Sequence, residues 1–213
     1  MPVGRAPINQ ARSHPSLAAL PEPILRRLEI YAALLAKWQR AMNLVGASTL
    51  DEVWVRHFAD SLQVSEVVPD ARKWLDLGSG AGFPGLVTAI RYADEKGASV
   101  HLVEANQRKC AFLREVARET RAPAVVHCGR IEEIVPLLDN NFEAVSARAL
   151  ASLPVLLGYA EKFIQDGAVG VFSKGKQLDA ELTDSLTIGK YLIATVGSNT
   201  CSEARLVLVR RRP

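Results

Sequence analysis

Hydrophobic side chains recur every three or four positions after Pro23, a spacing that is typical of an amphipathic helix. The apolar positions run from Ile24 to Trp38, and charged residues occupy the positions between them and continue to Arg40. A second helical pattern extends from about Leu50 to Val67 and ends before a proline. Because each pattern has one apolar face, we expect both helices to cover a larger hydrophobic element.

Short apolar runs separated by helical patterns follow in the rest of the chain. The runs of strand length are Lys73 to Leu77, Ser99 to Glu104, Ala124 to Cys128, Glu143 to Ala147 and Ala168 to Ser173. The helical patterns between them are Pro84 to Tyr92, Gln107 to Thr120, Ile131 to Leu138 and Leu153 to Ile164. Two last strands, Tyr191 to Val196 and Ala204 to Val209, flank a turn at Gly197-Ser198-Asn199 and predict a hairpin.

This alternation predicts an α/β fold. Apolar strands joined by helices form a parallel sheet that is covered on both faces and wound by right-handed crossovers. The terminal hairpin adds an antiparallel pair of strands. We expect a flexible leader over residues 1–20, a helical extension over 21–70 and an α/β domain over 71–213, with the helices and the domain packed as one compact unit.

Composition narrows the class of protein without deciding it. The 213 residues are 48% hydrophobic and carry a formal net charge of +3, which permits a nucleic-acid partner but does not demonstrate one. Three widely spaced cysteines are typical of a reducing compartment, and they form no metal-binding pattern with the four histidines. No apolar run reaches the roughly 18 residues of a membrane span. We therefore expect a cytoplasmic protein with no membrane contact and no metal site.

A glycine-rich segment, Asp76-Leu-Gly-Ser-Gly-Ala-Gly82, follows the first strand of the predicted sheet. Gly78 and Gly80 let the backbone turn sharply and bring its N–H groups close to a ligand. Glu104 ends the next strand, 22 residues after the last of these glycines. A carboxylate there can accept hydrogen bonds from both hydroxyls of a ribose. The sequence thus predicts a site for a nucleoside-containing cofactor.

Two kinds of cofactor fit this pattern. Gly80-Ala-Gly82-Phe-Pro-Gly85 also matches the dinucleotide motif, so a nicotinamide or flavin enzyme is an alternative. Asp76 favours S-adenosylmethionine, because a carboxylate at this position can hold the ammonium group of a methionine moiety but would repel a pyrophosphate. The chain also has no room for a separate substrate domain. The residues therefore favour a methyltransferase.

Several segments from residue 38 to residue 175 occur in an order that matches one family. They are Trp38-x4-Asn43-Leu44, Val55-Arg-His-x-x-Asp-Ser61, Asp76-x-Gly-x-Gly-x-Gly-x-Pro-Gly85, Arg108 to Val116, Gly129-Arg-Ile-Glu-Glu133, Ser146-Ala-Arg-Ala-x-Ala-Ser-Leu153 and Lys174-Gly175. With them the chain resembles the bacterial methyltransferases that modify a guanine at N7 in 16S ribosomal RNA, also called glucose-inhibited division protein B.

The resemblance implies a Rossmann-like class I methyltransferase with a mostly parallel seven-stranded sheet and S-adenosylmethionine as cofactor. The implied cofactor contacts are Gly78 and Phe83 along the cofactor, Glu104 at the ribose, and Ile131 and Glu132 beside the adenine. Arg148 would face the reactive end of the cofactor or the RNA. Asp76 and Gly80 complete the predicted pocket.

Guanine N7 has a lone pair and no proton to lose, so its methylation requires alignment of the reacting atoms and no general base. We assign no catalytic acid or base. His57 and Arg148 are candidates for orienting the acceptor, although a packing histidine paired with Asp60 is an equal interpretation of His57. The RNA-binding candidates are Arg56, His57, Lys174 and Lys176, at predicted loop or helix ends.

The expected partner is the ribosomal RNA of the small subunit, free or in an assembling subunit, and the expected oligomeric state is a monomer. Two alternatives stay open. One is an enzyme with the same cofactor and another RNA or a small molecule as acceptor. The other is a non-catalytic RNA-binding protein built on a Rossmann-like domain.

Overall fold

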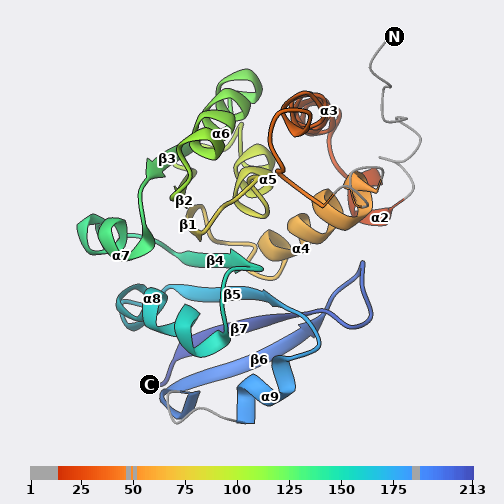
Figure 1. The fold of residues 1–213 in the computed structure, drawn as a ribbon. Coiled ribbons are helices and arrows are strands. Elements are labelled where there is room, and N and C mark those ends of the chain that lie inside the picture. Colours follow the sequence, from red (N-terminus) through yellow and green to blue (C-terminus); the bar gives the residue numbers. More distant parts are fainter. Residues whose placement is uncertain (1–13, 47–48, 50–51, 184–187) are drawn as a thin grey trace.

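The computed structural model describes residues 14–46, 49, 52–183 and 188–213, and Figure 1 shows its elements. The strands are β1 (Lys73–Leu77), β2 (Ser99–Glu104), β3 (Ala124–Cys128), β4 (Ala144–Arg148), β5 (Val169–Lys174), β6 (Tyr191–Gly197) and β7 (Arg205–Arg211). The α-helices are α2 (Pro15–Ala18), α3 (Glu22–Gln39), α4 (Asp60–Glu66), α5 (Gly85–Arg91), α6 (Gln107–Thr120), α7 (Ile131–Ile134), α8 (Leu153–Gln165) and α9 (Leu178–Thr183). A π-helix, η2 (Trp54–Ala59), precedes α4, and two 3-10 turns are η3 (Val135–Leu137) and η4 (Ile188–Lys190).

The strands form one seven-stranded sheet in the order β3-β2-β1-β4-β5-β7-β6. The pairs among β1 to β5 are parallel, whereas β7 runs antiparallel to both β5 and β6. This confirms the predicted fold class. The strand order reverses between β1 and β4, and in open α/β sheets ligands bind at the carboxyl ends of the strands next to such a reversal.

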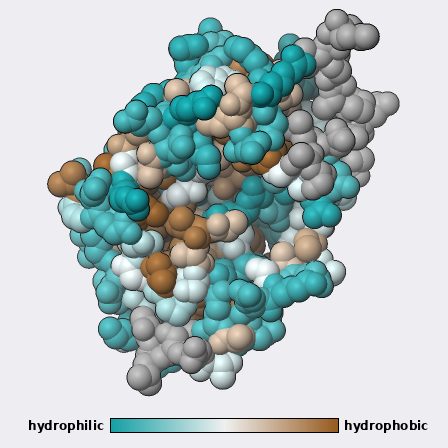
Figure 2. Space-filling view, viewed as in Figure 1, coloured by the Kyte–Doolittle hydropathy of each residue, from teal (hydrophilic) through white to brown (hydrophobic). Residues whose placement is uncertain are grey.

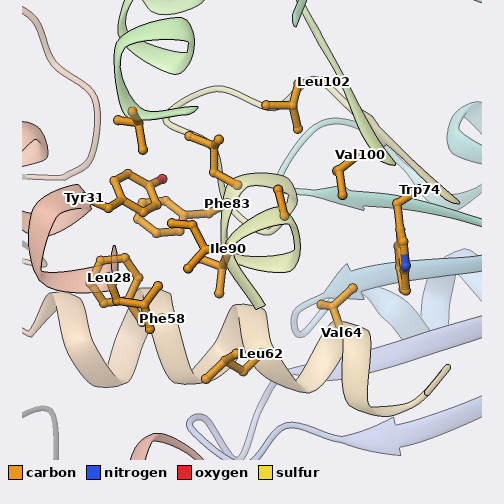
Figure 3. Packing of buried hydrophobic residues seen from close by; sticks show 14 of the residues in the cluster. Leu28, Tyr31, Phe58, Leu62, Val64, Trp74, Phe83, Ile90, Val100 and Leu102 are labelled. Atoms are coloured by element: carbon orange, nitrogen blue, oxygen red, sulfur yellow. The ribbon is translucent and has the colours of Figure 1, made fainter. Parts of the chain in front are cut away.

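Helices cover both faces of the sheet (Figure 1). One face packs against α3, α4, α5 and α6 in a core cluster that includes Leu28, Phe58 and Phe112. The other face packs against α8 and includes Phe163 and Leu178. Figure 3 shows the first cluster from close by, with Tyr31 and Phe83 side by side above Phe58. The predicted N-terminal extension therefore shares one core with the α/β domain.

Four elements differ from the sequence-based prediction. The helix predicted from about Leu50 to Val67 has its first two residues outside the described ones and contains the π-helix η2 before α4. Residues 1–13 of the predicted leader lie outside the described residues. The last part of the leader contains helix α2, whose Leu17 is fully buried in the core. The helix predicted over Ile131 to Leu138 is one α-helical turn followed by a 3-10 turn, because Pro136 lacks the N–H that an α-helix would use. Helix α9 was not predicted, since its six residues are too few to show a periodic pattern.

Candidate active site

A cavity of about 570 Å³ opens at the carboxyl ends of β1, β2 and β4, beside the reversal in strand order. Of the predicted site residues, those that line it are His57, Gly78, Gly80, Phe83, Glu104, Ile131, Glu132 and Arg148. Asp76, Arg56, Lys174 and Lys176 do not line it. The structure thus brings together eight side chains or glycines that lie far apart in the sequence.

The glycine turn forms the floor of this cavity. Gly78 and Gly80 have φ angles of +64° and +57°, in the left-handed region that favours glycine. A Cβ atom on Gly78 would lie 2.6 Å from Cδ1 of the partly exposed Leu150, which would have to move, so the positive φ is the main reason for glycine there. The backbone N–H of Gly80 donates a hydrogen bond of 2.9 Å to Glu104 Oε2. The turn and the carboxylate therefore position each other.

Glu104 is held at both oxygens by backbone groups. Besides Gly80, the N–H of Asn106 donates to Glu104 Oε1 at 2.8 Å. A carboxylate has about four lone-pair sites, so two remain for a ligand. Its fixed position and its place in the cavity wall suit a pair of neighbouring hydroxyl groups, as on a ribose. Glu104 lines the cavity as predicted, and its contact with a ribose stays a prediction.

Asp76 is buried beneath the turn and does not reach the cavity, contrary to the prediction. Its Oδ1 accepts a hydrogen bond of 2.7 Å from Ser146 Oγ, and a Cβ on Gly85 would lie 2.6 Å from its Oδ2. Burial raises the pKa of Asp76 to about 6, although the hydrogen bond from Ser146 opposes this. In this structure Asp76 supports the turn from below, linking β1 to β4.

The raised pKa of Asp76 predicts a pH-dependent stability difference. Between the ordinary pKa of 3.8 and about 6 the folded protein binds the proton more tightly than the unfolded chain, so its free energy of unfolding falls as the pH rises through this window. In Asp76→Asn this loss is absent. The free energy of unfolding of the variant minus that of the wild type should therefore increase by about 2 kcal/mol from about pH 4.5 to about pH 8. Urea unfolding of both proteins at the two pH values measures the gain, and a constant difference would contradict it.

Phe83 lies in a stack of aromatic rings at the other end of the turn. The Tyr31 ring stacks on it at a centroid distance of 5.2 Å, and the His57 ring stacks at 4.7 Å. The Arg148 guanidinium carbon lies 5.1 Å from the Phe83 centroid. The buried Tyr31 hydroxyl donates a hydrogen bond to the carbonyl oxygen of Ala81. Helix α3 is therefore connected directly to the glycine turn.

Tyr31→Phe should weaken binding at the cavity, because the buried carbonyl of Ala81 loses its donor. An unsatisfied buried group costs about 1–3 kcal/mol, and we expect about tenfold lower affinity for S-adenosylmethionine in calorimetric titration. Tyr191→Phe is the matched control, because Tyr191 is a buried tyrosine on β6, away from the cavity. Equal affinities in the two variants would show that Tyr31 has no role in positioning the turn.

His57 and Arg148 form a hydrogen-bonded network at the end of the cavity. Arg148 Nη2 lies 3.0 Å from His57 Nδ1, and His57 Nε2 lies 3.0 Å from Thr49 Oγ1. Since arginine can only donate, Nδ1 accepts, and the ring carries its proton on Nε2. Thr49 Oγ1 in turn donates to the Gly46 carbonyl at 2.8 Å. Burial and the charge of Arg148 lower the pKa of His57 to about 4, so the ring is neutral at neutral pH.

Lys174 departs from the predicted role in RNA binding. Its ammonium lies 2.7 Å from Glu181 Oε2 and donates to the Ala151 carbonyl at 2.9 Å, and its side chain is only 10% exposed. The same Glu181 oxygen accepts from the N–H of Leu153, at the start of α8. Lys174 does not line this cavity but a smaller neighbouring one, and its ammonium is directed to Glu181 on α9. It connects β5, α8 and α9.

Arg56 and Lys176 stay exposed, as an RNA-binding role requires. Arg56 pairs with Glu52 at 2.6 Å and Lys176 with Glu203 at 2.7 Å. Exposed ion pairs of this kind are weak, so a phosphate can compete for either cation. Their part in RNA binding stays a prediction.

Several residues of the cavity wall were not predicted. They are Leu44, Val45, Lys109, Arg130, Leu150 and Tyr159. Tyr159 donates a hydrogen bond of 2.6 Å to Glu132 Oε1 and so fixes one of the predicted residues. Figure 2 shows hydrophobic residues exposed on the side of α7 and α8, where Leu137, Leu150 and Val155 are among the exposed large side chains. A helical position such as Tyr159 gives no sequence signal of its own.

Two further types of site were searched for among the described residues. No group of three or more histidine, cysteine or acidic side chains is placed to hold a metal ion within them. In the same part of the chain, no helix combines the length and the apolar character needed to cross a membrane.

The fold and the cavity together define a Rossmann-like methyltransferase. Solved structures support this class at the level of the fold. The O-methyltransferase TomG from Streptomyces achromogenes, in complex with SAM, superimposes with a TM-score of 0.57 and 14% identity over 91% of each chain. Cofactor-bound Rv0187 from MTB has a TM-score of 0.58 and 15% identity, over 91% of this chain and 100% of that one.

The chain belongs to the family described as GidB, rRNA small subunit methyltransferase G, whose sequence model matches residues 24–196. A ribosomal RNA small subunit methyltransferase G of Methylorubrum populi is 48% identical over 182 residues, which are 85% of this chain and 86% of the relative. One from Bradyrhizobium sp. (strain BTAi1) is 46% identical over 184 residues, which are 86% of this chain and 83% of the relative. The family expected from the sequence is thereby confirmed.

Proposed function

We propose that this protein transfers the methyl group of S-adenosylmethionine to N7 of a guanine in the 16S ribosomal RNA. The observation that carries the proposal is the difference between the two ends of the cavity. At one end Glu104 is fixed by two backbone N–H groups, and at the other the Nδ1 of a neutral His57 accepts a hydrogen bond from Arg148, so this ring is not placed to act as a general base. Membership of the family adds the ribosomal RNA of the small subunit as substrate.

The residues present suit S-adenosylmethionine. Glu104 would accept the ribose hydroxyls, Ile131 and Glu132 would flank the adenine, and Gly78 and Phe83 would lie along the cofactor, since all of these line one cavity. When bound, the cofactor supplies an electrophilic methyl group on a sulfonium. The absence of a Cβ at Gly78 gives a ligand close access to the backbone, because a side chain there would meet Leu150.

The chemistry that we propose needs positioning more than proton transfer. Guanine N7 attacks through a lone pair and loses no proton, and the product carries the positive charge that leaves the sulfur. A His57 with a pKa of about 4 is neutral and does not act as an acid at neutral pH, and its Nδ1 accepts no proton while Arg148 donates to it. Its role is therefore to orient other groups. Such orientation can supply several kcal/mol of the barrier reduction.

The remaining parts of the proposal concern the setting of the reaction. Arg56 and Lys176 are exposed cations and would contact RNA phosphates outside the cavity. Ribosomal RNA as substrate implies that the protein acts in the cytoplasm, without a membrane. We propose that it acts as a monomer on free RNA or on an assembling small subunit.

Nucleoside analysis of 16S ribosomal RNA tests this function. RNA from a strain that lacks the protein should be missing one 7-methylguanosine, and purified protein with S-adenosylmethionine should restore it. Transfer of label to metabolites with none to ribosomal RNA would favour a small-molecule acceptor. Tight binding of RNA without any methyl transfer would favour a non-catalytic protein. Either result would overturn the proposal.

A further inference from the structure

A second cavity of about 220 Å³ lies beside the first, at the carboxyl ends of β4 and β5. Its lining includes Asp60, Arg148, Ala149, Ser173 and Leu206. Arg148 and Ala149 line both cavities. A molecule seated in the second cavity would therefore lie next to the end of the first cavity that Arg148 and Ala149 form.

A rigid ion pair forms one wall of the second cavity. Arg148 Nη1 lies 3.2 Å from Asp60 Oδ2, and the two side chains are 19% and 16% exposed. Asp60 Oδ1 also accepts hydrogen bonds from Ser198 at 3.2 Å and Thr200 at 2.9 Å. The hairpin turn between β6 and β7 thus holds the carboxylate in place. The wall presents a fixed acceptor beside a fixed donor.

The rest of the lining combines polar side chains that have partners with aliphatic surface. The polar members with partners are Lys174, Ser198 and Arg205. Ala204 and Leu206 contribute aliphatic surface. Ser173 Oγ is buried and has no hydrogen-bond partner among the residues that the structure describes. Ser173 lines the cavity, so a larger side chain at this position would occupy part of it without breaking a hydrogen bond of the described residues.

The cations around this cavity do not favour a phosphate. Arg148 pairs with Asp60, Lys174 with Glu181 at 2.7 Å, and Arg205 with Asp179 at 2.7 Å. Arg148 and Lys174 lie in ion pairs whose side chains are at most 19% exposed, so these two cations have little charge left to hold an anion. A cavity with paired charges, aliphatic surface and a donor beside an acceptor on one wall fits a planar base better.

We propose that the second cavity seats the guanine that receives the methyl group and that Asp60 and Arg148 read its edge; this rests on the proposed function. Guanine presents the acceptor O6 beside the donor N1–H, which complements an arginine donor beside a carboxylate acceptor. Adenine presents a donor at position 6 and an acceptor at N1, so both contacts would be repulsive. The lone pair of N7, on the other side of O6, stays free to react. RNA-modifying enzymes commonly read an extruded base at this edge.

Filling the cavity tests the proposal without touching the ion pair. Ser173→Val places a larger side chain in the wall of the second cavity and so reduces its volume. It also removes a hydroxyl that has no partner among the described residues. We expect at least about tenfold slower methylation of ribosomal RNA, with the calorimetric affinity for S-adenosylmethionine within about twofold of the wild type. Thr195→Val, on exposed β6 outside both cavities, is the matched control. Wild-type methylation by Ser173→Val would overturn the proposal.

A binding measurement provides a second readout that is independent of activity. In saturation-transfer NMR with protein loaded with S-adenosylhomocysteine, guanosine 5′-monophosphate should give a stronger signal than adenosine 5′-monophosphate. Asp60→Asn should remove this preference, because its amide presents a donor as readily as an acceptor. No preference in the wild type, or an undiminished one in Asp60→Asn, would overturn the assignment of the edge contacts.

Failure of this proposal and failure of the proposed function give different results. If the wild type does not methylate ribosomal RNA at all, the function is wrong, and the proposal that rests on it falls as well. If the wild type methylates a guanine and Ser173→Val does so equally well, the function stands and the guanine binds elsewhere.

Discussion

Replacing Glu104 with alanine is expected to weaken the binding of S-adenosylmethionine about 1,000-fold in calorimetric titration. Two hydrogen bonds from ribose hydroxyls to a charged acceptor are worth about 1.5–3 kcal/mol each, and both disappear. The variant also leaves the N–H groups of Gly80 and Asn106 without the acceptor that they have in the structure. The glycine turn would then lose the contact that fixes its position on the cavity floor.

Two variants serve as controls for Glu104→Ala. Glu104→Gln keeps one acceptor oxygen and the shape of the side chain, so its loss of affinity should be intermediate. Glu133→Ala removes an exposed glutamate near the cavity that does not line it, and affinity should stay at the wild-type value. Unchanged affinity in Glu104→Ala would show that the carboxylate does not hold the cofactor. Circular dichroism melting of all three variants excludes a general loss of folding.

The fold was predictable because its elements carry local signals. β1, β2 and β3 match their predicted limits residue for residue, and β4 and β5 are displaced by one residue. Each of these strands is a short apolar run between helical patterns. For β1 and β4, which are buried in the middle of the sheet, a parallel strand covered on both faces requires such a run. Signals of this kind depend only on neighbouring residues. The short helices α2 and α9 were not predicted, because one or two helical turns are too short to show a hydrophobic period.

The cavity floor was predictable for a related reason. Gly78, Gly80 and Glu104 occupy strand ends, and the parallel sheet brings such ends to one edge. The direction in which a side chain near that edge points could not be predicted from the motif. Asp76 and Lys174 both come from β-strands next to the cavity, yet one is covered by the glycine turn and the ammonium of the other is directed to Glu181 on α9. Motif position alone does not distinguish these cases.

Contacts over long sequence separations were not predictable at all. Asp60 meets Ser198, 138 residues away, and Arg148 meets His57, 91 residues away. The sequence allowed two interpretations of His57, as a packing residue paired with Asp60 or as a residue that orients the acceptor. The structure places Arg148 between them, with hydrogen bonds to both side chains. His57 and Asp60 are therefore linked through Arg148, and the role of His57 in orienting the acceptor stays a prediction.

That network predicts a large effect for Arg148→Ala, which should methylate ribosomal RNA about 1,000-fold more slowly than the wild type. A displaced acceptor costs about 100-fold, and loss of one base-reading contact costs about tenfold more. The affinity for S-adenosylmethionine should change less than tenfold, since Glu104 and the glycine turn are untouched. Single-turnover kinetics and calorimetry separate the two quantities. A fall in affinity as large as the fall in rate would place Arg148 in cofactor binding instead.

The pKa of His57 gives a further test of the same variant. Burial lowers this pKa first, and the charge of Arg148 lowers it further, so Arg148→Ala should raise it from about 4 while leaving it below the ordinary 6.5. Arg148→Lys keeps the positive charge but lacks the planar fork that reaches His57 and Asp60 together. It should therefore keep the low pKa and still lose most of the methylation rate. NMR titration of the ring measures the pKa, and a rate near the wild-type value in Arg148→Lys would show that charge alone is sufficient.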